Sequence, residues 1–273
     1  MTQPPLLTDR QALDRHRART AANPALFLHE TARDEAQDRL AMVNRTFTSA
    51  AVVTPFPHVW QKILPDAHMI PDEDTLDLKE GAHDLVIHAL ALHWANDPVG
   101  QIIQSRRALR PDGLFLCFTF GGETLHELRA ALGQAEIEVT GGLSPRVLPM
   151  GEIRDLGGLL QRSGLALPVA DTMPLTASYQ SALHLMRDLR AMGETNALSR
   201  RLRKPTRRAV LLRAAELYSE SFAQDDGRIP ATFEIITLTG WAPDANQPKP
   251  LRPGSAAHSL AEALGTRENP LKD

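Results

Sequence analysis

The sequence has one cysteine, no glycine before Gly81 and no long apolar run. The single cysteine, Cys117, lies inside an apolar segment, which excludes an intrachain disulfide and a cysteine-based zinc site. No apolar run reaches membrane-spanning length, and residues 1–20 lack the apolar core of a signal peptide. A net charge of −3 with dispersed basic residues offers no surface for nucleic acid. We therefore predict a cytoplasmic protein without a membrane span or a nucleic-acid partner.

The segment 84–120 predicts a strand, a helix and a second strand. Residues 84–92 form an almost unbroken apolar run, which is typical of a strand covered on both faces. Asp97 can cap the following helix, 99–109, and the turn after that helix leads into a second buried strand, 114–120. Gly121 follows this strand directly, so the backbone there can approach a ligand closely.

Strands and helical patterns alternate along the rest of the chain, which predicts an α/β fold with helices layered on a sheet. The predicted strands are 47–54, 68–70, 165–177 and 232–240, and the predicted helices are 57–64, 124–138, 150–162, 180–192 and 205–223. Two further helices, broken at Asn23-Pro24, are predicted within an N-terminal helical segment, 8–45. We predict one domain, 1–242, with a helical cap, 180–229, inserted before the last strand, and a proline-rich C-terminal tail, 243–273.

Five segments resemble class I S-adenosylmethionine (SAM) dependent methyltransferases. They are DLVIHALALHWANDP (84–98), LRPDGLFLCFTFGGETLHELR (109–129), GGLSPRVLPMGEIRDLGGLLQRSG (141–164), LMRDLRAMGETN (185–196) and DGRIPATFEIITLTGW (226–241). The branch concerned holds the malonyl-carrier-protein methyltransferase of biotin synthesis and the complex I assembly factors that modify an arginine, and the second group is the more similar. The resemblance implies a Rossmann-like sheet of seven strands, the last antiparallel, with SAM over the carboxyl ends of the first strands.

The sequence departs from this family where the cofactor cradle belongs. The family has a glycine-rich turn, DxGxGxG, after its first strand, but residues 52–57 read VVTPFP here. The spacing also differs, because only 34 residues separate Ala50 from Asp84. Three strands with their crossovers need about 50 residues. One βα unit is therefore predicted to be shortened or missing.

The candidate site residues follow the predicted parallel strands, at the sheet edge where open α/β sheets bind ligands. By resemblance, the cofactor contacts are Thr54, Asp72, His88 and Ala89. The candidates for catalysis are His88 and His93, since a histidine can serve as a base near neutral pH. The predicted substrate-binding residues are His93, Trp94, Asn96, Gly121, Gly122 and Glu123, with Arg187, Arg190, Glu194 and Asn196 facing them from the cap.

Three functions remain open from the sequence. The first is an active SAM-dependent methyltransferase of a small molecule or carrier protein, and the second is an assembly factor acting on a protein such as a complex I subunit. The third is a non-catalytic binding protein on a decayed methyltransferase scaffold. An iron oxygenase has less support, because none of the ten histidines has Asp or Glu two residues later, as a facial triad commonly does. No metal site is predicted.

Overall fold

The computed structural model describes residues 6–20, 22–248 and 264–266. The chain divides into two units, 1–243 and 244–273, and most of the predicted tail lies outside the described residues. The strands are β1 Ala50–Val53, β2 His68–Ile70, β3 His83–Ala89, β4 Leu109–Phe120, β5 Ala166–Tyr179 and β6 Ile229–Trp241. The helices are α1 Arg10–Thr20, α2 Phe27–Met42, α3 Pro57–Trp60, α4 Pro98–Ala108, α5 His126–Thr140, α6 Ile153–Arg162, α7 Ala182–Ala191 and α8 Arg208–Phe222, with a 3-10 turn η1 Leu92–Trp94.

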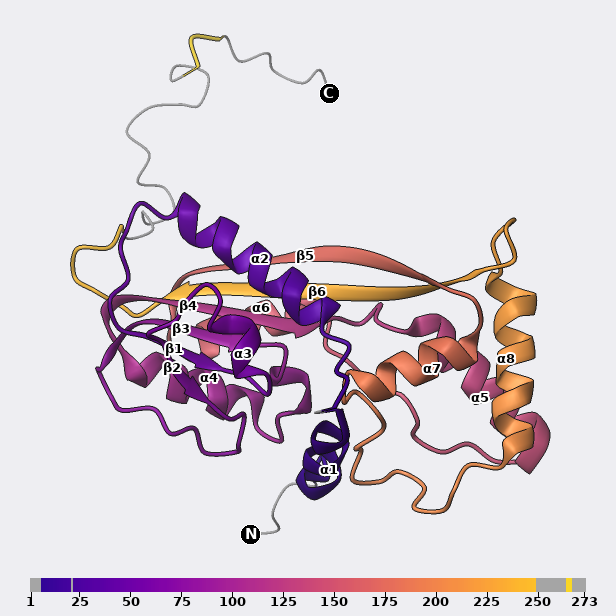
Figure 1. The fold of residues 1–273 in the computed structure, drawn as a ribbon. Helices are drawn as coiled ribbons and strands as arrows, with labels where there is room; N and C mark the ends of the chain where they lie inside the picture. The colour runs from indigo at the N-terminus through magenta and orange to yellow at the C-terminus, as the bar shows by residue number, and fades with distance from the viewer. Residues whose placement is uncertain (1–5, 21, 249–263, 267–273) are drawn as a thin grey trace, which may run out of the picture. The chain divides into compact units, whose positions relative to one another are not determined.

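The six strands form one sheet in the order β2-β1-β3-β4-β6-β5 (Figure 1). The first four are mutually parallel, and β6 runs antiparallel between β4 and β5. This confirms the predicted α/β class and the shortened βα region. No helix lies between β2 and β3, so among the described residues the sheet has six strands where the resemblance implied seven.

Helices cover both faces of the sheet, and each face has its own apolar core. Every residue of β3 is buried, as the unbroken apolar run predicted. One core joins the sheet to α2, α3, α5, α7 and α8, and the other joins it to α4 and α6. Among the described residues, no helix has the length and apolarity needed to cross a membrane.

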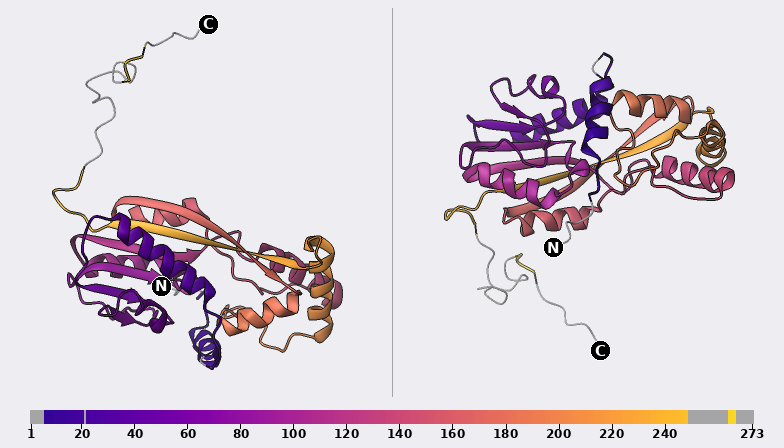
Figure 2. Two further views of the ribbon diagram at one scale, coloured as in Figure 1. Left: turned by 45° about the horizontal axis from the view of Figure 1, so that its top comes forward. Right: turned by 90° about the horizontal axis from the view of Figure 1, so that it is seen from below.

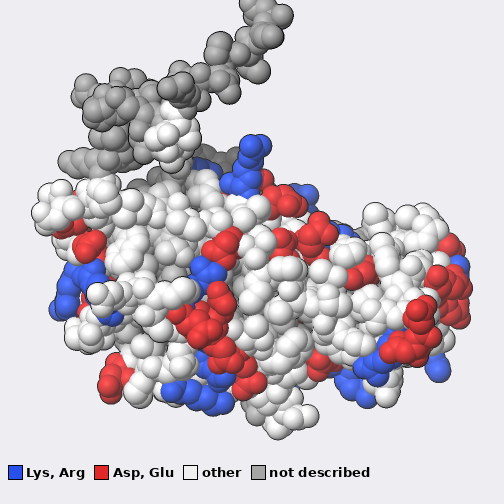
Figure 3. All heavy atoms as spheres, turned by 90° about the horizontal axis from the view of Figure 1, so that it is seen from above, with Lys and Arg blue, Asp and Glu red and all other residues white. Residues whose placement is uncertain are grey.

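The cap is built on a long ribbon formed by β5 and β6. This ribbon extends past the other strands and carries α7 and α8, while α5 packs against α8 at the same end (Figures 1 and 2). Helix α5 thus packs with the cap helices, although the predicted cap, 180–229, did not include it. On the face seen in Figure 3, acidic and basic side chains lie close together. Arg39 of α2 pairs with Glu35 and with Asp171 of β5.

Candidate functional site

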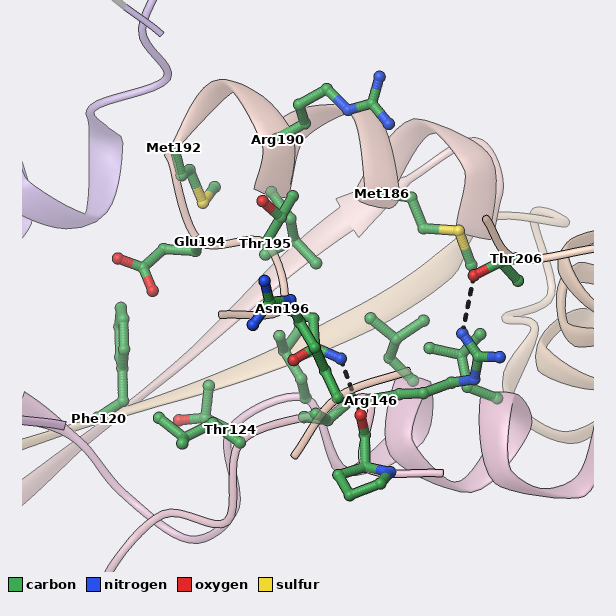
Figure 4. A pocket seen from close by; sticks show the side chains of 18 of the residues that line it. Phe120, Thr124, Arg146, Met186, Arg190, Met192, Glu194, Thr195, Asn196 and Thr206 are labelled. Carbon is green, nitrogen blue, oxygen red and sulfur yellow. Dashed lines mark hydrogen bonds between the residues drawn. The ribbon is translucent and has the colours of Figure 1, made fainter. Parts of the chain in front are cut away.

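A cavity of about 770 Å³ lies between the carboxyl end of β4 and the cap. Its walls come from the end of β4, from α5 and α7, and from the segments 144–150 and 194–206 (Figure 4). Most of the lining is apolar, including Phe120, Leu128, Met150, Met186 and Met192. A largely apolar cavity with a few polar groups is the usual form of a ligand site.

Glu194 is the acidic residue in the wall of this pocket, and it lies close to Phe120 (Figure 4). Trp94 Nε1 donates a hydrogen bond of 2.6 Å to Glu194 Oε2, and His93 Nε2 donates one of 3.2 Å to the same oxygen. Burial raises the pKa of Glu194, but the His93 charge and the hydrogen bonds outweigh this effect and leave the pKa below its usual value. The pocket therefore presents an ionised carboxylate beside aromatic rings.

A second carboxylate holds the segment 144–146 in place. Glu136 of α5 accepts bonds from the backbone N–H and hydroxyl of Ser144 (2.9 and 2.8 Å) and from Nε and Nη2 of Arg146 (2.9 and 2.6 Å). Hydrogen bonding to Arg146 lowers the pKa of Glu136 to about 2. Arg146 also donates to Thr206, and Asn196 donates to the Pro145 carbonyl, as the dashed lines in Figure 4 show. These bonds fix one wall of the pocket.

We expect Glu136→Ala to lower the free energy of unfolding by about 2 to 3 kcal/mol, because it leaves the half-buried Arg146 guanidinium without its charged acceptor. The matched control is Glu138→Ala on the same helix, whose carboxylate makes an exposed pair with Arg213. That control should leave the urea unfolding midpoint almost unchanged. Equal losses in both variants would contradict a special role for Glu136.

The structure brings some of the predicted substrate-binding residues together and not others. Trp94 lines the pocket, and His93 lies behind it, bonded to Glu194. Asn96 instead accepts the backbone N–H of Thr8 at 2.9 Å, and Glu123 is exposed. Of the four cap residues, Arg187, Arg190, Glu194 and Asn196, all line the pocket.

The glycine pair after β4 is packed against the protein's own carboxylates. A Cβ atom at Gly121 would collide with the Glu234 side chain, and one at Gly122 would collide with Glu152. Neither glycine lines the cavity. Other groups do approach the backbone of Gly121 and Gly122 closely, as predicted. In this structure those groups are the chain's own Glu234 and Glu152 side chains. A ligand-binding role for the two glycines stays a prediction.

The predicted cofactor contacts lie at the carboxyl ends of β1, β2 and β3. Thr54, His88 and Ala89 are buried, and none of them lines the cavity. His88 Nε2 donates to Gln101 Oε1 at 2.7 Å, and burial lowers the pKa of His88 to about 4. Asp72 is also buried, and its carboxylate is bonded to α1. With α1 in this position the residues do not fit a bound SAM, because the acidic group expected to hold its ribose is already occupied.

No metal-binding group of three or more His, Cys, Asp or Glu side chains occurs in the part of the chain that the structure describes. The chemistry visible at the site is that of a carboxylate and a tryptophan N–H, with His93 bonded to the same carboxylate. The mostly parallel sheet with its antiparallel strand β6 agrees with the fold that the resemblance to methyltransferases implied.

Comparison with known proteins supports this class. Residues 23–117 match the family model described as a methyltransferase domain. A relative from Danio rerio named "Arginine-hydroxylase NDUFAF5, mitochondrial" is 40% identical over 200 residues, covering 73% of this chain and 62% of that protein. The human protein of the same name is 39% identical over 206 residues, covering 76% and 59%. A malonyl-[acyl-carrier protein] O-methyltransferase from Laribacter hongkongensis is 35% identical over 183 residues, covering 67% and 59%.

The resemblance found in the sequence is thus confirmed for both groups of the branch. The chain spans about three fifths of the length of these relatives. The arginine-hydroxylase relatives from zebrafish, Dictyostelium discoideum and human are all named as mitochondrial, which contradicts the predicted cytoplasmic location. Composition is a poor guide to location, because the amino-acid content of a folded domain does not encode an organelle address.

Proposed function

We propose that this chain is a methyltransferase-type protein that acts on, or assists the assembly of, a protein partner, and that a side chain of the partner enters the pocket. The proposed partner is a subunit of respiratory complex I, and the proposed cofactor is SAM. The observation that carries the proposal is the ionised Glu194 carboxylate, held by Trp94 and His93 in a mostly apolar cavity. A carboxylate in such a cavity can accept strong hydrogen bonds from a cationic ligand.

Arginine is the side chain that fits this pocket end best. Its guanidinium donates hydrogen bonds to a carboxylate, which Glu194 supplies, and stacks on aromatic faces, which Trp94 and Phe120 supply. Several relatives are named arginine hydroxylases, which supports the same choice. In this role Glu194 binds and orients the guanidinium, and the apolar walls exclude water from it.

A second candidate is a methyltransferase acting on a small acyl group or a carrier protein. The long apolar lining favours it, as do Arg187 and Arg190, which line the pocket and would attract an acidic acyl end. The relative named malonyl-[acyl-carrier protein] O-methyltransferase supports it as well. The two candidates differ in ligand charge: the first needs a cation beside Glu194, and the second needs an anion beside the arginines.

Peptide binding separates these candidates. We expect arginine peptides tiling the complex I subunits to include binders, and the same peptides with citrulline in place of arginine to bind about tenfold more weakly or worse. Glu194→Gln keeps the size and removes the charge, so it should abolish this preference, as measured by fluorescence anisotropy. The control Glu216→Gln, on exposed helix surface, should keep it. Binding of a malonyl-pantetheine thioester in place of every peptide would favour the second candidate.

A further inference from the structure

The segment 199–208, which connects α7 to α8, is strongly basic. It reads SRRLRKPTRR, so six of its ten residues are Arg or Lys and none is acidic. Protein surfaces ordinarily mix charges of both signs, as the face in Figure 3 does. A cluster of one sign repels itself, and it is typical of a surface that a partner of opposite charge neutralises.

This segment borders the mouth of the pocket. A residue that lines the cavity and is also exposed marks where the cavity opens to solvent. Among the described residues, six meet both conditions: Pro145, Leu183, Arg187, Arg190, Leu202 and Pro205. Four of them are apolar, two are arginines and none is acidic. In Figure 4 the Arg190 side chain points from α7 away from the cavity. A side chain that enters the pocket therefore passes an apolar opening with cations beside it.

Most of the basic side chains around this mouth are available to a partner. Within the described parts of the chain, the carboxylate that pairs with the segment is that of Asp9, and it reaches only Arg201 and Arg203. The remaining cations of α7 and of the segment are exposed and have no acidic partner among the described residues. We call these six residues the basic rim: Arg187, Arg190, Arg200, Lys204, Arg207 and Arg208.

Asp9 indicates which kind of anion suits this surface. Its carboxylate lies 2.9 Å from Arg201 Nη1 and 3.3 Å from Arg203 Nη1. Thr8, one residue earlier, forms an antiparallel bridge with Leu198. The basic segment thus already binds one carboxylate that is carried on an extended stretch of chain. A guanidinium binds a carboxylate in this way because its planar N–H groups match the two oxygens.

We propose that the basic rim docks an acidic segment of the protein partner, so that the side chain entering the pocket is flanked in that partner by aspartate or glutamate. This inference rests on the proposed function, because it describes how the same pocket recognises the chain around its target arginine. Glu194 inside the cavity and the rim outside it have opposite charges. The site therefore selects a cation within and carboxylates around the mouth.

The test compares two labelled peptides by fluorescence anisotropy with the full chain. Both peptides carry one central arginine, which is flanked by glutamates in the first and by glutamines in the second. We expect the glutamate peptide to bind about tenfold more tightly at about 0.1 M salt. This ratio should approach one at about 1 M salt, because the Debye length falls from about 10 Å to about 3 Å.

The rim variant is Arg200→Gln combined with Lys204→Gln, two exposed residues that do not line the cavity. It should lower the ratio of the two affinities about threefold, since exposed ion pairs contribute modestly, and leave the glutamine peptide bound as by wild type. The matched control is Arg154→Gln combined with Arg162→Gln, two exposed arginines of α6. It removes the same charge and should keep the wild-type ratio.

The outcomes separate the rim from the pocket. Glu194→Gln should weaken both peptides alike, whereas the rim variant should weaken only the glutamate peptide. Equal wild-type affinity for the two peptides overturns the rim and leaves the proposed function standing.

If neither arginine peptide binds, the proposed function fails, and the glutamate peptide with citrulline at its centre reports on the rim alone. Binding that the rim variant weakens supports the rim, and no binding overturns it. Wild-type protein that sediments with phosphatidylglycerol vesicles but binds neither glutamate peptide would assign the rim to a lipid surface and overturn the proposal.

Discussion

Replacing Trp94 with alanine is expected to lower the free energy of unfolding by about 3 to 5 kcal/mol, the usual cost of removing a large buried aromatic ring. The Trp94 side chain is almost fully buried and packs with Leu13, Leu148 and Leu198. Its loss also leaves Glu194 with one hydrogen-bond donor fewer. Urea unfolding monitored by circular dichroism measures the change. Trp94 was predicted only as a substrate-binding residue, but its burial makes it part of the packing as well as of the pocket wall.

Trp94→Phe separates packing from hydrogen bonding. Phenylalanine retains most of the ring volume but has no N–H for Glu194, so its cost should be about 1.5 to 3 kcal/mol, typical of a bond to a charged group. Arginine-peptide binding should weaken in both variants, because the carboxylate loses the donor that fixes its position. A Trp94→Ala protein as stable as wild type would show that this end of the pocket is loosely packed, contrary to the structure.

The sequence predicted the secondary structure well because each element depends on local patterns. The unbroken apolar run before His93 predicted β3, and the Asp97-Pro98 pair predicted the start of α4, where Asp97 accepts the N–H of Gly100. The missing βα unit followed from chain length alone, because residues between Ala50 and Asp84 cannot form three strands with crossovers. These inferences needed no knowledge of which segments meet in space.

The candidate site was harder to predict because it depends on pairs of residues distant in sequence. Nothing local indicates that Arg17 meets Asp72, or that Glu194 meets Trp94. The placement of Arg10 and Arg17 seven residues apart does put both on one helix face, a signal that could have marked α1 as a basic surface facing an acid. Glu136 and Arg146 gave no such signal, since the loop between them could have folded in many ways. Tertiary pairing, and not residue type, decided which polar groups reached the pocket.

Two buried histidines, His88 and His29, make the free energy of unfolding depend strongly on pH. Burial lowers the pKa of His88 to about 4 and that of His29 to about 3, because desolvation disfavours the charged imidazole. In the unfolded chain both titrate near about 6.5. Below that pH the unfolded chain takes up protons that the folded chain refuses, so the free energy of unfolding falls as the pH falls. Each group contributes a slope of up to about 1.4 kcal/mol per pH unit between the two pKa values.

We therefore expect the free energy of unfolding, measured with urea, to fall by about 2 to 5 kcal/mol between pH 7 and pH 4.5 because of the two groups together. The fall should be steepest below pH 6.5. His88→Gln cannot titrate, so it should reduce the slope by up to about 1.4 kcal/mol per pH unit even if its stability at pH 7 is lower. The control His126→Gln, at an exposed position whose ring contacts the Glu123 carbonyl and the Phe222 ring, should keep the wild-type slope. A wild-type protein equally stable at pH 7 and pH 4.5 would mean that His88 and His29 accept protons in the folded state. Their surroundings would then have to be open to water.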